Sequence, residues 1–153
     1  MCGFVGFSSL EKDLSKDIHI VKDMNMKMQK RGLDEEGYFF NKSINLGHRT
    51  LITTNSENTK QPMSIKYQDT IYTIVYNGEI YNSDEVKKDL MSKGYEFLTT
   101  GVAEIVLLAF IEYGEKSVEL FNGIFAYAIW DNENLFLARD RLGIKPLFYS
   151  NQD

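Results

Sequence analysis

Nearly continuous apolar runs constrain the fold of this chain more than any other feature. Residues 71–76 and 124–130 carry aromatic, β-branched or other apolar side chains at almost every position. A strand that is apolar throughout is buried on both of its faces, whereas a half-exposed strand alternates. These two stretches therefore predict sheets that are covered on both sides, as in a layered domain.

Turn-forming residues divide the rest of the chain into further short extended segments. The polar stretches 41–43 and 131–134 each separate two apolar runs, in the pattern of a β-hairpin. A strand that opens at Leu147 has no partner left in the chain, so a C-terminally truncated domain is expected. Strands are predicted at residues 2–7, 38–40, 44–48, 49–54, 121–131 and 135–140, within a hairpin at 67–77, and from residue 147 onward.

Helices are expected at residues 17–30, 84–93 and 103–113, with a short helical turn at 116–120. Ile18, Val21 and Met28 recur at the spacing of one helical face. Ser83 precedes the second helix, and its hydroxyl is expected to cap the first turn. Together with about seven strands, these helices predict an α+β domain in which helices cover packed antiparallel sheets.

The charge balance and the cysteine count exclude several functional classes. The net charge of −5 disfavours nucleic acid or an anionic membrane as a main partner, because both require basic surfaces. The single cysteine cannot form an internal disulfide, which is typical of the cytoplasm. No apolar stretch resembles a signal peptide or a membrane span. One cysteine and two distant histidines give no metal-ligand spacing, so no metal site is expected.

The single cysteine, Cys2, follows the initiator Met1. Removal of Met1 would leave Cys2 with a thiol and an α-amine on one carbon. The amine can accept the thiol proton, directly or through water, and the resulting thiolate is a nucleophile. A cysteine at position 2 is also compatible with no function, because a signal this short is weak by itself.

Several motifs in order along the chain resemble the class II glutamine amidotransferase domain, most closely that of glutamine-hydrolysing asparagine synthetases. The Tyr-Asn-Gly-Glu-Ile-Tyr-Asn stretch at 76–82 carries the family's Asn-Gly-Glu-Ile-Tyr-Asn signature, and the Arg-Gly-Leu-Asp loop at 31–34 is similar to its Arg-Gly-Pro-Asp loop. The resemblance spans essentially the whole chain. The other similar blocks are residues 1–6, 61–63, 123–131 and 138–147.

The resemblance implies an N-terminal-nucleophile hydrolase fold, a four-layer αββα sandwich of two antiparallel sheets. It also implies that Cys2 attacks the side-chain amide of glutamine and forms a thioester that water hydrolyses. The side-chain amide of Asn77 and the backbone N–H of Gly78 would then stabilise the oxyanion. The competing interpretation of Asn77-Gly78 is a tight turn, since Asn-Gly is a common turn pair.

The implied substrate contacts depart from the family pattern. The family holds the α-carboxylate of glutamine with Arg in a His-x-Arg-Leu pattern and the α-amine with Asp in a Thr-x-Ser-Asp-x-Glu pattern. Thr50 and Val102 stand at these two positions here, and neither can replace a charged group. Arg49 could substitute only through a one-residue slip, which would turn it to the opposite face. The substrate-binding positions implied by the resemblance are Arg49, Thr50, Leu51, Thr53, Glu79 and Val102, the second and the last by position only.

Two hypotheses about function follow. The first is the glutaminase half of an asparagine-synthetase-like enzyme, which feeds ammonia to an ATP-activated aspartate in a following synthetase domain. ATP and Mg²⁺ would bind only there, so no cofactor is expected in these residues, and a homodimer is compatible with the resemblance. The second is an altered module in which weak glutamine binding leaves the domain as a scaffold for an ammonia-dependent synthetase.

Overall fold

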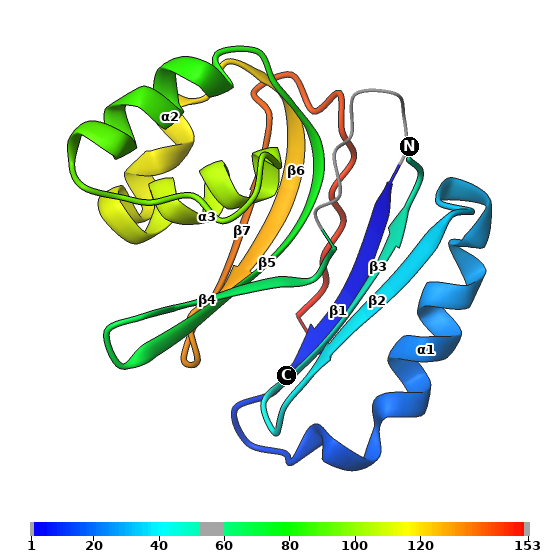
Figure 1. Ribbon diagram of the computed structural model, residues 1–153. Helices are drawn as coiled ribbons and strands as arrows, with labels where there is room; N and C mark the ends of the chain where they lie inside the picture. The colour runs from blue at the N-terminus through cyan, green and yellow to red at the C-terminus, as the bar shows by residue number, and fades with distance from the viewer. Residues whose placement is uncertain (1, 53–59, 152–153) are drawn as a thin grey trace.

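Two antiparallel sheets, stacked face to face, form the centre of the fold. The computed structural model describes residues 2–52 and 60–151. Within these residues one sheet has the strand order β1-β3-β2 and the other β4-β5-β6-β7. Helix α1 covers the outer face of the first sheet, and α2 and α3 cover the outer face of the second (Figure 1). The expected four-layer αββα sandwich is confirmed.

The bounds of the elements follow the chain order. The three-stranded sheet contains β1 (Gly3–Ser8), β2 (Glu35–Phe40) and β3 (Ile44–Thr50). The four-stranded sheet contains β4 (Met63–Tyr67), β5 (Thr70–Ile80), β6 (Gly123–Trp130) and β7 (Leu135–Arg139). The helices are α1 (Ile18–Lys27), α2 (Ser83–Ser92) and α3 (Val102–Tyr113), with 3-10 turns at Leu14–Lys16, Gln29–Arg31 and Gly114–Leu120.

Strand β3 shows how side-chain alternation builds the layers. Ile44 and Leu46 are buried between the sheets, where they meet Val75 of β5 and Trp130 of β6. The intervening residues point the other way, and the Asn45 side chain donates a hydrogen bond to the carbonyl of Leu14. Successive side chains of a strand alternate between faces, so one strand serves two layers. Burial of each aliphatic side chain in this core stabilises the folded state by roughly 2 kcal/mol.

The second core lies between the four-stranded sheet and its two helices. Ile74, Tyr76 and Tyr127 present one sheet face to the buried residues Val106 and Leu107 of α3. This explains the continuous apolar runs, because β5 and β6 are covered by helices on one face and by the other sheet on the opposite face. No helix in the described part of the chain is long and apolar enough to cross a membrane.

Several predicted boundaries are wrong. The predicted strand 44–48 and the segment after it form one strand that reaches Thr50, whereas positions 53 and 54 lie outside the described residues. The hairpin predicted within 67–77 instead pairs β4 with β5. Ser83 is not the N-cap, because α2 already begins there; the preceding Asn82 donates instead to the carbonyl of Leu120. Among the strands of the described residues, β1 pairs only with β3, so it is an edge strand and not fully buried.

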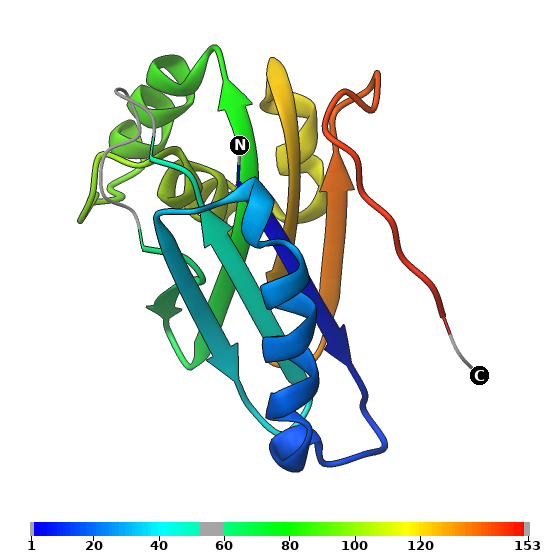
Figure 2. The ribbon, with the colours of Figure 1, turned by 90° about the vertical axis from the view of Figure 1, so that its right-hand side faces the viewer.

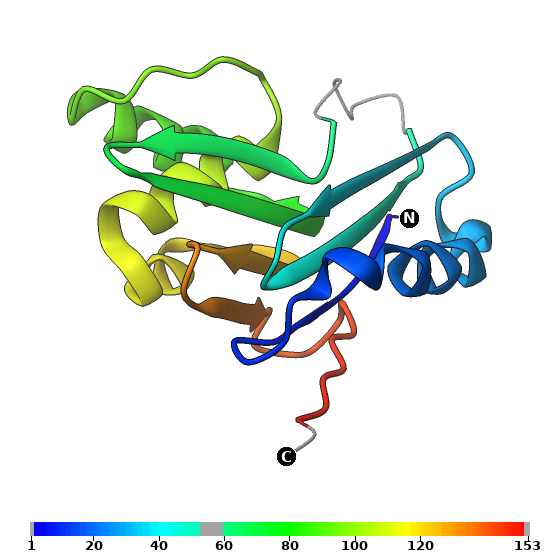
Figure 3. The ribbon, with the colours of Figure 1, turned by 90° about the horizontal axis from the view of Figure 1, so that it is seen from below.

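The strand expected from Leu147 is also wrong. Among the described residues, the segment after β7 has no strand and runs away from the two sheets (Figures 2 and 3). Phe148 and Tyr149 are 91% and 81% exposed. Strands are stabilised by cross-strand pairs, and this segment pairs with no described strand, so its apolar residues do not form one.

Candidate active site

Cys2 lies at the entry to β1, at one end of the space between the sheets. Its thiol is 4.0 Å from the carbonyl oxygen of Leu51, and its own carbonyl accepts a hydrogen bond of 3.4 Å from Arg31. Gly3 pairs with Arg49 across β1 and β3, so the register brings Cys2 beside Thr50. The thiol is half-buried. The nucleophile predicted from the sequence is therefore fixed at a sheet edge and still accessible to a small molecule.

Asn77 and Gly78 lie within β5, so the turn interpretation of this pair is wrong. They pair with Ala126 and Phe125 of β6. Asn77 is 7% exposed and alternates onto the same face as Val75, which packs between the sheets. Its side-chain amide therefore belongs to the inner face, opposite β1 and β3. No described residue forms a hydrogen bond with this amide.

Gly78 is required by the close approach of β6. A Cβ atom at this position would lie 2.4 Å from the carbonyl oxygen of Ile124 and 2.6 Å from the Cα of Phe125. Real Cβ contacts are longer, so any other residue would push the two strands apart. The Asn-Gly pair thus combines a buried amide with a backbone that only glycine fits.

A buried histidine ties the two sheets together beside this site. The Nε2 atom of His48 in β3 lies 3.0 Å from the carbonyl oxygen of Tyr76 in β5, and its Nδ1 lies 3.2 Å from the hydroxyl of Thr50. A carbonyl can only accept, so Nε2 carries the proton and the Thr50 hydroxyl donates to Nδ1. His48 is fully buried. Burial lowers its pKa to about 4, although the bond to the Tyr76 carbonyl acts in the opposite direction.

Thr50 and Arg49 point to opposite faces of the first sheet. Thr50 faces inward with His48, whereas the Nε of Arg49 donates to the carbonyl of Asn25 in α1 at 3.2 Å. The Arg49 guanidinium also lies 2.7 Å from a carboxylate oxygen of Glu36. No register slip occurs, and Arg49 is held on the helix side. The structure therefore does not bring Arg49 together with Cys2 and Asn77.

Glu79 and Tyr76 lie on β5, on the strand that carries Asn77. Glu79 is exposed and shares the inward-facing side of the strand with Asn77. Burial raises the pKa of the Tyr76 phenol, and the charges of Glu79 and Cys2 raise it further. Both groups thus lie within electrostatic range of this buried phenol, whose hydroxyl has no hydrogen-bond partner among the described residues.

Val102 and Glu104 occupy the first turn of α3. Val102 is half-buried and packs against the apolar core beneath the helices. Glu104 is 1% exposed and accepts hydrogen bonds from the backbone N–H groups of Leu98 and Thr99, both at 2.7 Å. The carboxylate of Glu104 therefore holds the backbone of the loop before α3 in place. Val102 offers no charged group to a ligand.

The remaining predicted position, Thr53, lies outside the described residues. The sequence pattern did not indicate Glu35, which pairs with Thr50 and lies on the inner face of β2, because the strand was expected to begin only at Tyr38. The pattern also did not single out the Gln61 side chain, whose oxygen accepts a 2.6 Å hydrogen bond from the N–H of Tyr76. Alternation counted back from Phe39, which packs between the sheets, would have placed Glu35 inward.

These contacts give an arrangement suited to acyl transfer. A half-buried thiol lies on one sheet, and a buried carboxamide lies on the facing strand of the other. A thiolate can attack a carbonyl carbon, and amide N–H groups can stabilise the oxyanion that forms. Among residues 2–52 and 60–151, no group of three His, Cys, Asp or Glu side chains could hold a metal ion.

Known proteins are similar to this chain over nearly its full length. A family profile described as "Glutamine amidotransferase domain" matches residues 1–153. Glutamine-hydrolysing asparagine synthetase 3 of Bacillus subtilis (strain 168) is 38% identical over 154 residues, which cover 99% of this chain and 25% of that protein. A glutamine-hydrolysing asparagine synthetase of Zea mays is 30% identical over 97% of this chain and 25% of its own length. The chain thus spans about a quarter of these relatives.

Two solved structures share the fold. The allosteric regulatory enzyme of purine biosynthesis aligns with 68% of this chain and 25% of its own at a TM-score of 0.60. Glutamine phosphoribosylpyrophosphate amidotransferase from B. subtilis aligns with 65% of this chain and 24% of its own at a TM-score of 0.55. Each is 20% identical to this chain, so the likeness concerns the arrangement of sheets and helices.

Proposed function

Because this chain belongs to the class II glutamine amidotransferase family, with the fold of N-terminal-nucleophile hydrolases, we propose that it hydrolyses glutamine with Cys2 as the nucleophile. The observation that supports this most directly is the placement of Cys2 beside the inward-facing Thr50, with Asn77 on the facing strand. Removal of Met1, which lies outside the described residues, would supply the α-amine that acts as the base.

The reaction proceeds in two acyl-transfer steps. The Cys2 thiolate forms a bond to the side-chain amide carbon of glutamine, and the carbonyl π electrons move to oxygen. The Asn77 amide and the Gly78 N–H stabilise this oxyanion. When the carbonyl re-forms, the C–N bond breaks, and the nitrogen takes the proton that came from the thiol and leaves as ammonia. Water then attacks the thioester, which releases glutamate and restores the thiol.

The names of the relatives connect glutamine hydrolysis, which releases ammonia, to asparagine synthesis. We infer that this domain supplies ammonia to a synthetase domain, where an ATP-activated carboxylate, that of aspartate, accepts it. ATP and Mg²⁺ would act there, since the hydrolysis itself needs only a thiol, a base and water. A homodimer is compatible with this scheme. We place the reaction in the cytoplasm, where a free thiol stays reduced.

The decisive experiment compares the protein with its Cys2→Ala variant. Glutamate release from glutamine should fall to background in the variant, and an electrophilic glutamine analogue should label only the unsubstituted protein. Mass spectrometry of the intact protein should show that Met1 is absent from the active form. Cys2-independent glutamate release, or Met1 retained on fully active protein, would overturn the assignment.

A second candidate function rests on the orientation of Thr50 and Arg49. The inward position carries a hydroxyl, and the only guanidinium of this pair is bound to Glu36 and Asn25 on the helix side. In that case the domain binds glutamine poorly and serves as a scaffold for a synthetase that uses free ammonia. The synthetase would then form its product from free ammonia at full rate even when this domain carries Cys2→Ala. It would form no product from glutamine, with either the variant or the unsubstituted domain.

A further inference from the structure

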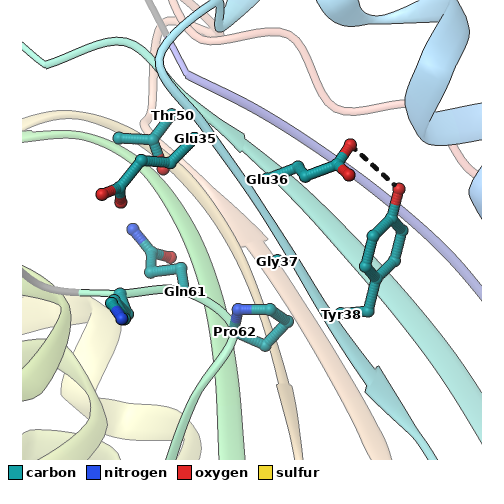
Figure 4. A pocket seen from close by; sticks show the side chains of 8 residues that line it. Glu35, Glu36, Gly37, Tyr38, Thr50, Gln61 and Pro62 are labelled. Carbon is teal, nitrogen blue, oxygen red and sulfur yellow. Dashed lines mark hydrogen bonds between the residues drawn. The ribbon is translucent and has the colours of Figure 1, made fainter.

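A cavity of about 460 Å³ opens at the inward side of Thr50, between β2 and the segment that leads into β4. We propose that this cavity binds the zwitterionic α-amino-acid end of the amide substrate, with Glu35 holding the ammonium group and Lys60 the carboxylate. This deepens the proposed function and rests on it for the identity of the substrate. Figure 4 shows the Glu35 carboxylate and the Gln61 side chain facing one another across the cavity.

The cavity adjoins the nucleophile through the strand register. Glu35 pairs with Thr50, and Gly3 pairs with Arg49 on the other side of the same strand. Cys2, Thr50 and Glu35 therefore form one row across β1, β3 and β2. The next residue after β3, Leu51, has its carbonyl oxygen 4.0 Å from the Cys2 thiol. The cavity thus begins one strand away from the reacting atom.

The length of glutamine fits this row. Neighbouring strands lie about 4.8 Å apart. The backbones at Cys2 and Glu35 are two strand spacings apart, which is about 10 Å. An extended glutamine measures about 5 Å from its side-chain amide carbon to its α-nitrogen. With a reacting distance of about 3.3 Å at the thiol and an ion-pair hydrogen bond of about 2.8 Å at the other end, the assembly spans about 11 Å.

The charges that line the cavity select a zwitterion. Glu36 also lines it but is bound to Arg49 at 2.7 Å and accepts a 3.3 Å hydrogen bond from Tyr38, so its carboxylate is engaged. The side chains of Glu35 and Lys60 form no hydrogen bond or ion pair with any described residue. They are the carboxylate and the ammonium that remain for a ligand. A free amino acid carries the complementary pair of charges.

The rest of the lining favours a polar ligand. Gln61 is fixed because its oxygen accepts from the Tyr76 N–H at 2.6 Å, which leaves its amide N–H₂ as a donor. Gly37 keeps the wall close, since a Cβ there would lie 1.9 Å from the carbonyl oxygen of Gln61. The Thr50 hydroxyl already donates to His48, so it offers only its lone pairs.

The test measures binding separately from catalysis. In the Cys2→Ala background, the dissociation constants of three ligands are measured by ligand-observed NMR at neutral pH: glutamine, glutaramate, which lacks the ammonium, and 4-aminobutanamide, which lacks the carboxylate. Glu35→Gln should weaken glutamine binding fivefold to tenfold and leave glutaramate binding within twofold. Lys60→Gln should weaken glutamine binding equally and leave 4-aminobutanamide binding within twofold. The exposed residues Glu133 and Lys116 provide the matched controls Glu133→Gln and Lys116→Gln.

The outcomes distinguish this inference from the proposed function. If glutamine binding in Glu35→Gln and Lys60→Gln stays within twofold of the controls, the cavity does not hold the substrate, whether or not Cys2 hydrolyses glutamine. If both variants show the ligand-specific losses but the protein releases no glutamate, the binding site stands and the glutaminase assignment fails. Absence of measurable glutamine binding overturns both. Both side chains are exposed, so thermal unfolding should match the controls.

Discussion

The imidazole of His48 in β3 donates a 3.0 Å hydrogen bond to the carbonyl oxygen of Tyr76 in β5, so one buried side chain joins the two sheets. On its other side the ring accepts a 3.2 Å hydrogen bond from Thr50. Both ring nitrogens are therefore satisfied only in the neutral form. A proton on Nδ1 would remove this acceptor and place a charge where water has no access.

The first prediction is that stability falls between pH 6.5 and pH 4. Burial lowers the pKa of His48 from its ordinary value of 6.5 to about 4. Between these pH values His48 is protonated in the unfolded chain but stays neutral in the folded chain, so the free energy of unfolding decreases as pH falls. The neutral His48 makes its full contribution to the free energy of unfolding above pH 6.5. About 3 kcal/mol of this free energy is lost by pH 4.

Denaturant titrations at several pH values test this slope. His48→Gln lowers stability at neutral pH, but it should remove the part of the pH dependence that His48 causes between pH 6.5 and pH 4. His19→Gln is the control, because His19 is exposed. An unchanged slope in His48→Gln would show that other groups cause the dependence.

The second prediction concerns the oxyanion donor. Asn77→Ala should lower kcat for glutamine hydrolysis by about 10²–10³-fold, because one donor in such a site is worth this much. KM should change little, since the donor acts on charge that develops during the reaction. Steady-state glutamate release and a matched thermal unfolding curve check both points. If kcat decreases by less than tenfold while the protein remains folded, Asn77 is not the oxyanion donor.

The third prediction is a steric one at Gly78. Gly78→Ala should destabilise the protein by about 2–3 kcal/mol, because the new methyl group would overlap the Ile124 carbonyl and force β5 and β6 apart. Gly94→Ala separates this effect from backbone strain. Gly94 has a φ of +94°, and a Cβ added there would meet nothing within 4 Å, so only the conformational cost of about 1 kcal/mol applies. Equal losses in the two variants would argue against the steric explanation.

The fourth prediction addresses the loop before α3. Glu104 accepts from the N–H groups of Leu98 and Thr99 and from the Thr99 hydroxyl, at 2.7, 2.7 and 2.6 Å. Glu104→Gln should cost about 3 kcal/mol of stability, because hydrogen bonds to a buried charge are the strong ones. Hydrogen exchange at residues 98–101 should accelerate more than exchange in β5. Uniform acceleration would mean that the carboxylate supports the whole fold and not this loop.

The fifth prediction sets the two candidate functions against each other. Thr50→Arg places a guanidinium beside Glu35, its cross-strand partner, and removes the hydroxyl that His48 accepts from. If Glu35 holds the substrate ammonium, the new ion pair should weaken glutamine binding severalfold. If the domain simply lacks an anchor, Thr50→Arg combined with Val102→Asp should strengthen binding instead. Glutamine dissociation constants in the Cys2→Ala background decide between these outcomes.

The sequence predicted the layered architecture because the continuous apolar runs of β5 and β6 require cover on both faces. It failed at Ser83 and at Leu147, where the outcome depends on distant partners. Asn82 bonds to Leu120 far along the chain, and Leu147 has no strand beside it among the described residues. Capping and strand formation depend on such neighbours, which local patterns do not contain.

The sequence by itself determined the family and the loss of charge at Thr50 and Val102, and it predicted Cys2 as the nucleophile, since residue types in order are enough for these. Only the tertiary structure decided which faces the side chains occupy. It turned Arg49 toward α1, placed Asn77 inside a strand and brought Glu35 into the row of Cys2. The physical reason is that a strand reverses its side chains at every residue, so the role of a residue depends on the register set by the whole sheet.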